Sequence, residues 1–144
     1  MNDIRLELPL PPSMNVYWRR GRAKGSGQVV THLTHEGRAF RRHVKMLWLA
    51  QRKGRAPLEG PVSVDATLWF PTMASDVDNR IKPCLDALEH AGVFGNDRQV
   101  ALVQFMRGGT VGRKNEGVML VEVGSFEWRA ETVAEFKRAA EWEI

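Results

Sequence analysis

The feature that most constrains this fold is a strict alternation of apolar and other residues near the middle of the chain. Apolar side chains occupy every second position from Val62 to Phe70. A period of two is the pattern of a β-strand that buries one face. Pro71 ends this strand, and the apolar spacing then changes to that of a helix. The chain therefore needs a sheet with helices packed against it, which is an α+β fold with a mixed β-sheet.

Three further strands are predicted. Apolar residues alternate with charged ones in 4–8, and Pro9 ends this segment. Segments 99–106 and 118–123 are also rich in strand formers, and glycines and basic residues fill the stretch between them. We expect these last two strands to form an antiparallel pair across that turn.

Helical spacing appears in three segments. A helix is predicted over about 35–52, because Thr34 precedes an apolar stripe that includes Phe40 and Trp48. A second helix is predicted from Asp78, as its N-cap, to residue 91, where Gly92 ends it. The acidic segment 131–143 is predicted to be a short amphipathic helix.

Length and composition limit the class of protein. The 144 residues are enough for one domain with a hydrophobic core, so 1–144 is expected to be a single domain. Cys84 is the only cysteine, which excludes an internal disulfide and a zinc site built on several cysteines. No apolar run reaches the roughly 20 residues that span a bilayer, and no signal-peptide pattern is seen. We expect a cytoplasmic protein without a membrane partner.

Charge is distributed unevenly along the chain. Residues 1–55 hold twelve Lys and Arg against three acidic residues, whereas 56–144 hold nine against fourteen. The stretch 15–30 combines basic residues with glycines and is predicted to be a mobile basic loop or the tip of a hairpin. On the helix over 35–52, four basic residues lie off the apolar stripe. A basic first half of this kind indicates binding to an anionic partner such as nucleic acid.

Acidic residues gather around the second helix. Asp76 and Asp78 stand two residues apart before it, Lys82 and Asp86 follow at intervals of four, and Asp97 comes after it. If the helix packs on the sheet, the loop with Asp97 could fold back to complete an acidic pocket. Clustered aspartates are ligands for Mg²⁺ or Mn²⁺ in phosphodiester hydrolysis. Spacing alone fits a structural explanation equally well. In that explanation Asp78 caps the helix, Lys82 and Asp86 form a solvated pair, and Asp97 is a turn residue.

Two motifs resemble those of the RusA family of Holliday-junction resolvases, over about residues 4–123. The first is Leu8-Pro9-x-Pro11-Pro12-Ser13-x-Asn15-x-Tyr17, followed by Glu36-Gly37-x-Ala39-Phe40-Arg41. The second comprises Asp76, Asp78, Asn79, Lys82, Asp86, Gly92 and Asp97 at the family's spacing. Family members often carry Asp where this chain has Asn96, and the extension over 125–144 lies outside the resemblance.

The resemblance implies a single RusA-like domain that nicks opposed strands of four-way junction DNA as a homodimer. It implies that Asp76, Asp78 and Asp97 hold Mg²⁺ or Mn²⁺, that Lys82 acts at the scissile phosphate, and that Asn79 and Asp86 support these groups from behind. A bacterial or phage-encoded, nucleoid-associated protein of DNA recombination and repair is expected. The residues expected to contact DNA are Asn15, Arg19, Arg20, Arg22, Lys24, Arg38, Arg41, Arg42 and Lys45.

The sequence is also compatible with two other functions. The chain could be a non-catalytic protein that binds DNA junctions, in which the aspartates are structural. It could also be a phosphodiesterase for RNA or another branched nucleic acid. Tyr17 and Trp18 could stack on unpaired bases or could pack at the base of the basic loop, and the sequence favours neither.

Overall fold

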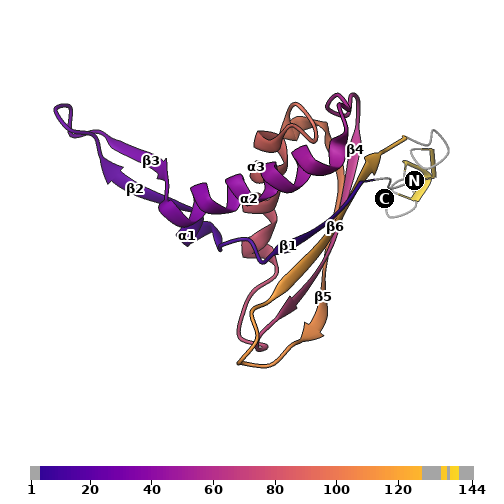
Figure 1. Cartoon of the computed structure of the whole chain (residues 1–144). Coiled ribbons are helices and arrows are strands. Elements are labelled where there is room, and N and C mark those ends of the chain that lie inside the picture. Colours follow the sequence, from indigo (N-terminus) through magenta and orange to yellow (C-terminus); the bar gives the residue numbers. More distant parts are fainter. Residues whose placement is uncertain (1–3, 128–133, 136, 140–144) are drawn as a thin grey trace.

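The computed structural model describes residues 4–127, 134–135 and 137–139. A four-stranded sheet is covered on one face by two helices, and a two-stranded hairpin projects from this body (Figure 1). This architecture confirms the α+β expectation. The sheet contains β1 (Ile4–Pro9), β4 (Val62–Phe70), β5 (Val100–Thr110) and β6 (Val118–Ser125). The hairpin contains β2 (Trp18–Arg22) and β3 (Val29–Leu33). The helical segments are α1 (Met14–Tyr17), α2 (His35–Arg52), η1 (Asp78–Arg80), α3 (Ile81–Ala91) and η2 (Asp97–Gln99).

The strand order is β1-β6-β4-β5, with β4 parallel to β5 and antiparallel to β6. The expected antiparallel pair of the last two strands is therefore wrong, because β4 lies between them. The chain leaves β4, crosses the sheet through η1 and α3, and returns as β5 in the same direction. Parallel neighbours need such a crossover. The turn that follows β5 then leads to β6, which pairs with the other side of β4.

Glycines at the end of β5 were expected to form the turn, but the strand continues through them to Thr110. Gly108 lies against the Trp69 indole, where an added Cβ would come within 2.5 Å of ring atoms. Gly109 has φ +143° beside a register shift between Leu68 and Trp69. Glycine is needed here because the strand passes over a large ring and bulges.

The core lies between the helices and one face of the sheet. On β1, Ile4, Leu6 and Leu8 are buried and the intervening residues are exposed, as the alternation predicts. From α2, Phe40, Val44 and Trp48 enter the same core. Each fully buried apolar side chain of this size contributes about 1.5–3 kcal/mol to stability. This burial fixes α2 and α3 against the sheet.

The segment predicted to be a mobile basic loop or the tip of a hairpin forms a hairpin. Residues 14–17 form one helical turn, and Trp18–Arg22 pairs with Val29–Leu33 in an antiparallel hairpin. Pairing satisfies the backbone groups of a segment whose side chains are nearly all exposed. Only the tip, over residues 23–28, corresponds to the expected basic loop.

The base of the hairpin is fixed to the start of α2. The Thr34 hydroxyl accepts a hydrogen bond from Gly37 N–H and caps the helix, as predicted. The same hydroxyl donates to the Tyr17 carbonyl at 3.1 Å. An added Cβ on Gly37 would lie 2.6 Å from this carbonyl, so only glycine allows α1 and α2 to approach so closely.

The helix expected over 131–143 falls largely outside the described residues, and those described there, 134–135 and 137–139, have helical backbone. No described helix is long and apolar enough to cross a membrane.

Candidate active site and nucleic-acid interface

The loop that follows β4 carries the first two candidate ligands. Asp76 and Asp78 are exposed there, and Asp78 begins the short helix η1. The expected capping role for Asp78 is wrong, since no side chain caps η1 or α3. Within residues 4–127 the Asp78 carboxylate has no hydrogen bond or ion pair. Its charge is therefore free to meet a ligand from solution.

Two arginines shape this loop around Phe70, the buried last residue of β4. Arg107 lies 4.8 Å from the ring centroid and donates to the Ser75 carbonyl, directly before Asp76. Arg80 lies 5.7 Å from the same centroid and donates to the Pro11 carbonyl. Burial lowers the pKa of Arg80, and the nearby Asp76 charge partly opposes this shift. The two guanidinium groups thus hold the chain on either side of Asp76.

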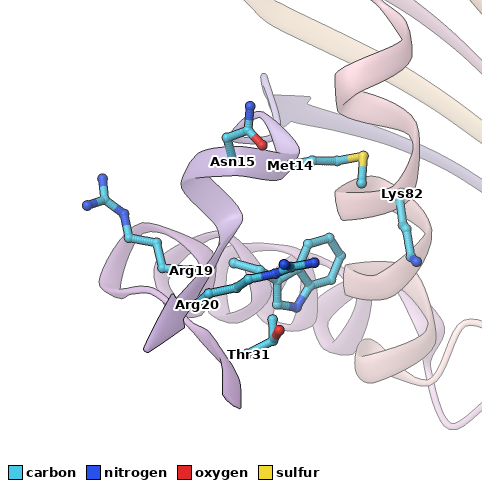
Figure 2. A pocket seen from close by; sticks show the side chains of 7 residues that line it. Met14, Asn15, Arg19, Arg20, Thr31 and Lys82 are labelled. Carbon is cyan, nitrogen blue, oxygen red and sulfur yellow. The ribbon is translucent and has the colours of Figure 1, made fainter. Parts of the chain in front are cut away.

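Lys82 is exposed in the first turn of α3, four residues after Asp78. It lines an open cleft of about 960 Å³ between α3, α1 and the hairpin. Met14 and Asn15 of α1 line the opposite wall, with Arg19, Arg20 and Trp18 from β2. In Figure 2, Met14 points toward Lys82, Arg20 extends from β2 to the same side, and Arg19 points away.

Asp97 lies at the other end of the sheet, so the single-chain acidic pocket expected from the sequence is not formed. It precedes Val100, which pairs with Val62 at the start of β4. Asp76 follows Phe70 at the end of β4. The nine residues of β4 span about 25 Å, and the eleven residues of α3 span about 16 Å. Among the described residues, no group of three metal-binding side chains gathers in one place.

The surroundings of Asp97 are fixed locally. The Asn96 side chain accepts from Arg98 N–H, and the Gln99 side chain accepts from Asn96 N–H, which completes a capping box around η2. Partial burial and the charges of Asp97 and Asp86 raise the pKa of Glu89. The neutral Asn96 is thus a cap that presents Asp97 to solvent.

A polar network joins the three helices behind the cleft. Arg41 Nε lies 2.9 Å from Asp86 Oδ2 and 3.1 Å from the Tyr17 hydroxyl, and that hydroxyl also donates to Asp86. Arg41 Nη2 lies 2.8 Å from the same carboxylate oxygen. Arg41 therefore points inward, away from the basic face expected for it. Asp86 pairs with α2, so the alternative of a solvated pair with Lys82 is also wrong.

Comparison with known proteins gives the family of this arrangement. The family model described as "Endodeoxyribonuclease RusA" matches residues 9–123. The chain belongs to the RusA endodeoxyribonuclease family. A relative from Enterobacteria phage HK97, named crossover junction endodeoxyribonuclease rusA, is 30% identical over 87% of this chain and 99% of its own length. The relative of the same name from Escherichia coli K12 is 34% identical over 69% of this chain and 78% of its own.

The RusA-family match covers both motifs except Leu8 and ends within β6. Its first motif builds α1 and the base of the hairpin, and its second builds the loop, α3 and η2. The family expectation is therefore confirmed, and the chain is an endodeoxyribonuclease. Arg80 and Arg107 were missed, and Arg41 was expected to contact DNA rather than Asp86, because no spacing rule marks an arginine that binds a carbonyl or a distant carboxylate.

The other basic residues that the sequence of this RusA-family chain assigns to DNA binding form two exposed groups. The hairpin carries one group, and the side of α2 away from the sheet carries the other. Arg38 also donates to the Leu33 carbonyl at 2.8 Å, which ties α2 to the end of the hairpin. The exposed members expected to contact DNA are Arg19, Arg20, Arg22, Lys24, Arg38, Arg42 and Lys45.

Proposed function

We propose that this RusA-family endodeoxyribonuclease resolves four-way DNA junctions by paired nicks in opposed strands, as a homodimer that uses Mg²⁺ or Mn²⁺. The expectation of a Holliday-junction resolving nuclease agrees with the family and with the names of both relatives. The metal, the dimer and the site residues are proposals that rest on the geometry described above.

The observation that carries the proposal is the placement of Asp76, Asp78 and Lys82. Two exposed carboxylates stand on a loop that two partly buried arginines hold, and an exposed lysine follows one helical turn later. An exposed cluster of this kind adds little to stability. It does offer two oxygen donors and one cation to a phosphodiester, which is the chemistry a nuclease needs.

Asp76 and Asp78 fit a hard divalent ion in ligand type, since Mg²⁺ and Mn²⁺ prefer carboxylate oxygens. Asp97 is too far away to join them within one chain. We therefore place Asp97 of a second copy beside Asp76 and Asp78 of the first. Two-fold symmetry then gives two equivalent sites, which matches two nicks in a junction that is itself roughly two-fold symmetric.

The bound ion would activate water and stabilise charge on the phosphate. Lys82 would add a positive charge at the scissile phosphate from α3. Arg107, through Ser75, would keep Asp76 in place. Asn79 and Asp86 would support the ligands indirectly, Asp86 by anchoring α3 to α2 through Arg41.

Affinity for DNA would come from the exposed basic residues of the hairpin and α2, together with Asn15. Because the hairpin projects from the body (Figure 1), it can reach a second arm of a branched substrate. Phosphate contacts of this kind position DNA without reading its sequence.

A cleavage assay tests the proposal. Synthetic four-way junction, matched duplex and branched RNA are incubated with the protein, with and without Mg²⁺ or Mn²⁺. We expect paired nicks in the junction alone, only with metal, and none with Asp76→Asn. The exposed Glu7 on β1, at the opposite edge of the sheet from β5, supplies the control Glu7→Gln, which should cut normally. Undiminished cutting by Asp76→Asn would contradict the metal assignment, and binding without cutting would favour the non-catalytic alternative.

A further inference from the structure

The cleft beside Lys82 has two kinds of wall. Lys82 and Arg20 supply positive charge, whereas Met14 and Trp18 supply apolar surface. No carboxylate lines it in the part of the chain that the structure describes. Its volume of about 960 Å³ lies at the upper end of the range for small-molecule pockets, which is large enough for a single nucleotide.

The structure separates the roles of the two neighbouring aromatic residues. Tyr17 is fully buried, and its hydroxyl is engaged by Asp86 and Arg41. Tyr17 is therefore part of the core and cannot contact a ligand. Trp18 is only partly buried and contributes to the cleft.

Tyr17 also holds the Trp18 ring in place. The two ring centroids are 4.3 Å apart and the planes make an angle of 73°, which is an edge-to-face contact. Since Tyr17 is itself anchored to α2 and α3 through Arg41 and Asp86, Trp18 has a fixed orientation. A rigid, partly exposed indole is a suitable platform for a nucleobase.

We propose that this cleft binds one unstacked nucleotide at the branch point, with its base on Trp18 and its phosphate between Lys82 and Arg20. The inference rests on the proposed function and adds a specificity-determining residue to it. A paired base inside a duplex arm is stacked on both sides and cannot turn toward an indole that lines a cleft. A base at the crossover can, because its stacking on one side is already interrupted.

Binding of the base would therefore favour junctions over duplex before any sequence is read. It would also bring the adjoining phosphate to Lys82, so that recognition of the branch and placement of the phosphodiester depend on the same nucleotide. Loss of one base–aromatic stack weakens binding by about tenfold.

The test measures binding to a four-way junction and to a duplex of the same arm sequences, without divalent metal so that neither is cut. For Trp18→Leu we expect about tenfold weaker junction binding and unchanged duplex binding. Trp18→Phe keeps an aromatic face and should restore most of the junction affinity. Equal loss on both DNAs, or no loss on either, would overturn the inference.

A second measurement uses only the unchanged protein, so it does not depend on how the variants fold. Abasic sites replace the nucleotides next to the branch point, and a control junction carries them in the middle of an arm. We expect the first junction to bind about as weakly as the Trp18→Leu complex and the control to bind normally. Equal affinity for the two junctions would contradict the proposed pocket. Failure of the protein to cut junctions with metal would instead contradict the proposed function.

Discussion

The guanidinium of Arg41 and the carboxylate of Asp86 meet at 2.8 Å, with 26% and 25% of their side chains exposed. The pair connects α2, which carries part of the basic surface, to α3, which carries Lys82. Tyr17 joins the pair from α1, where the hairpin begins. The distance between the DNA-binding arm and the candidate catalytic lysine therefore depends on three side chains that lie behind the cleft.

Asp86→Asn should destabilise the fold by about 1–3 kcal/mol. It removes the negative charge that accepts hydrogen bonds from two nitrogens of Arg41 and from the Tyr17 hydroxyl. Urea unfolding measures the loss. Glu59→Gln removes an exposed carboxylate with no such network and should change stability by less than about 0.5 kcal/mol. Equal stability of the two variants would show that the network does not hold the helices together.

Tyr17 should make stability depend on alkaline pH. Burial and the Asp86 hydrogen bond raise the pKa of Tyr17 well above its ordinary value of 10.0. Above about pH 10 the unfolded chain releases this proton and the folded chain keeps it, so stability falls as pH rises. Tyr17→Phe removes this contribution. The stability advantage of the wild-type chain over Tyr17→Phe should therefore shrink between pH 9 and 11 in urea unfolding, and a constant difference would be inconsistent with the raised pKa.

Lys82→Ala should lower the cleavage rate of bound junction by about 10²–10³-fold, since a positive charge at the developing phosphate charge is lost. Binding should change only a few-fold, because many other cations contact the DNA. Single-turnover cleavage and equilibrium binding separate the two effects. A variant that binds poorly but cuts what it binds at the normal rate would refute the role at the phosphate.

The hairpin should account for much of the salt dependence of binding. Each lost phosphate contact reduces the slope of log affinity against log salt by about 0.9. Replacement of Arg19, Arg20 and Arg22 by Ser should thus lower the slope by up to about 2.7. Arg5→Ser is the control, because Arg5 lies on β1 and pairs with Glu122 at 3.2 Å. A similar fall in slope for both proteins would show that the hairpin has no special part in binding.

Local patterns predicted the elements that frame the site, and the failures have a common cause. The alternation over 62–70 was sufficient to predict β4, and the apolar stripe was sufficient to predict α2. In both elements burial selects the residue type at every position of the repeat. The hairpin was partly missed since its strands bury almost nothing, so the β-branched residues Val29, Val30 and Thr31 were the only signal.

The position of Asp97 and the inward turn of Arg41 depend on which strands pair. Spacing along the sequence put Asp97 near Asp76. The parallel strand β5, however, begins beside Val62, at the end of β4 that is far from Asp76. Likewise, Arg41 lies off the apolar stripe of α2, and only the packing of α3 brings Asp86 to it. Neither result is contained in the periodicity of a single element.

The central claim is that Asp76 and Asp78 of one copy act with Asp97 of another. Asp76→Asn and Asp97→Asn are prepared separately and then mixed by unfolding and refolding together, and junction nicking is assayed with Mg²⁺. In a mixed dimer with shared sites, one site carries both substitutions and the other carries neither. The account predicts that each variant alone is inactive and that the mixture regains single nicks. A mixture that forms dimers and binds junctions but stays as inactive as its parts would contradict it.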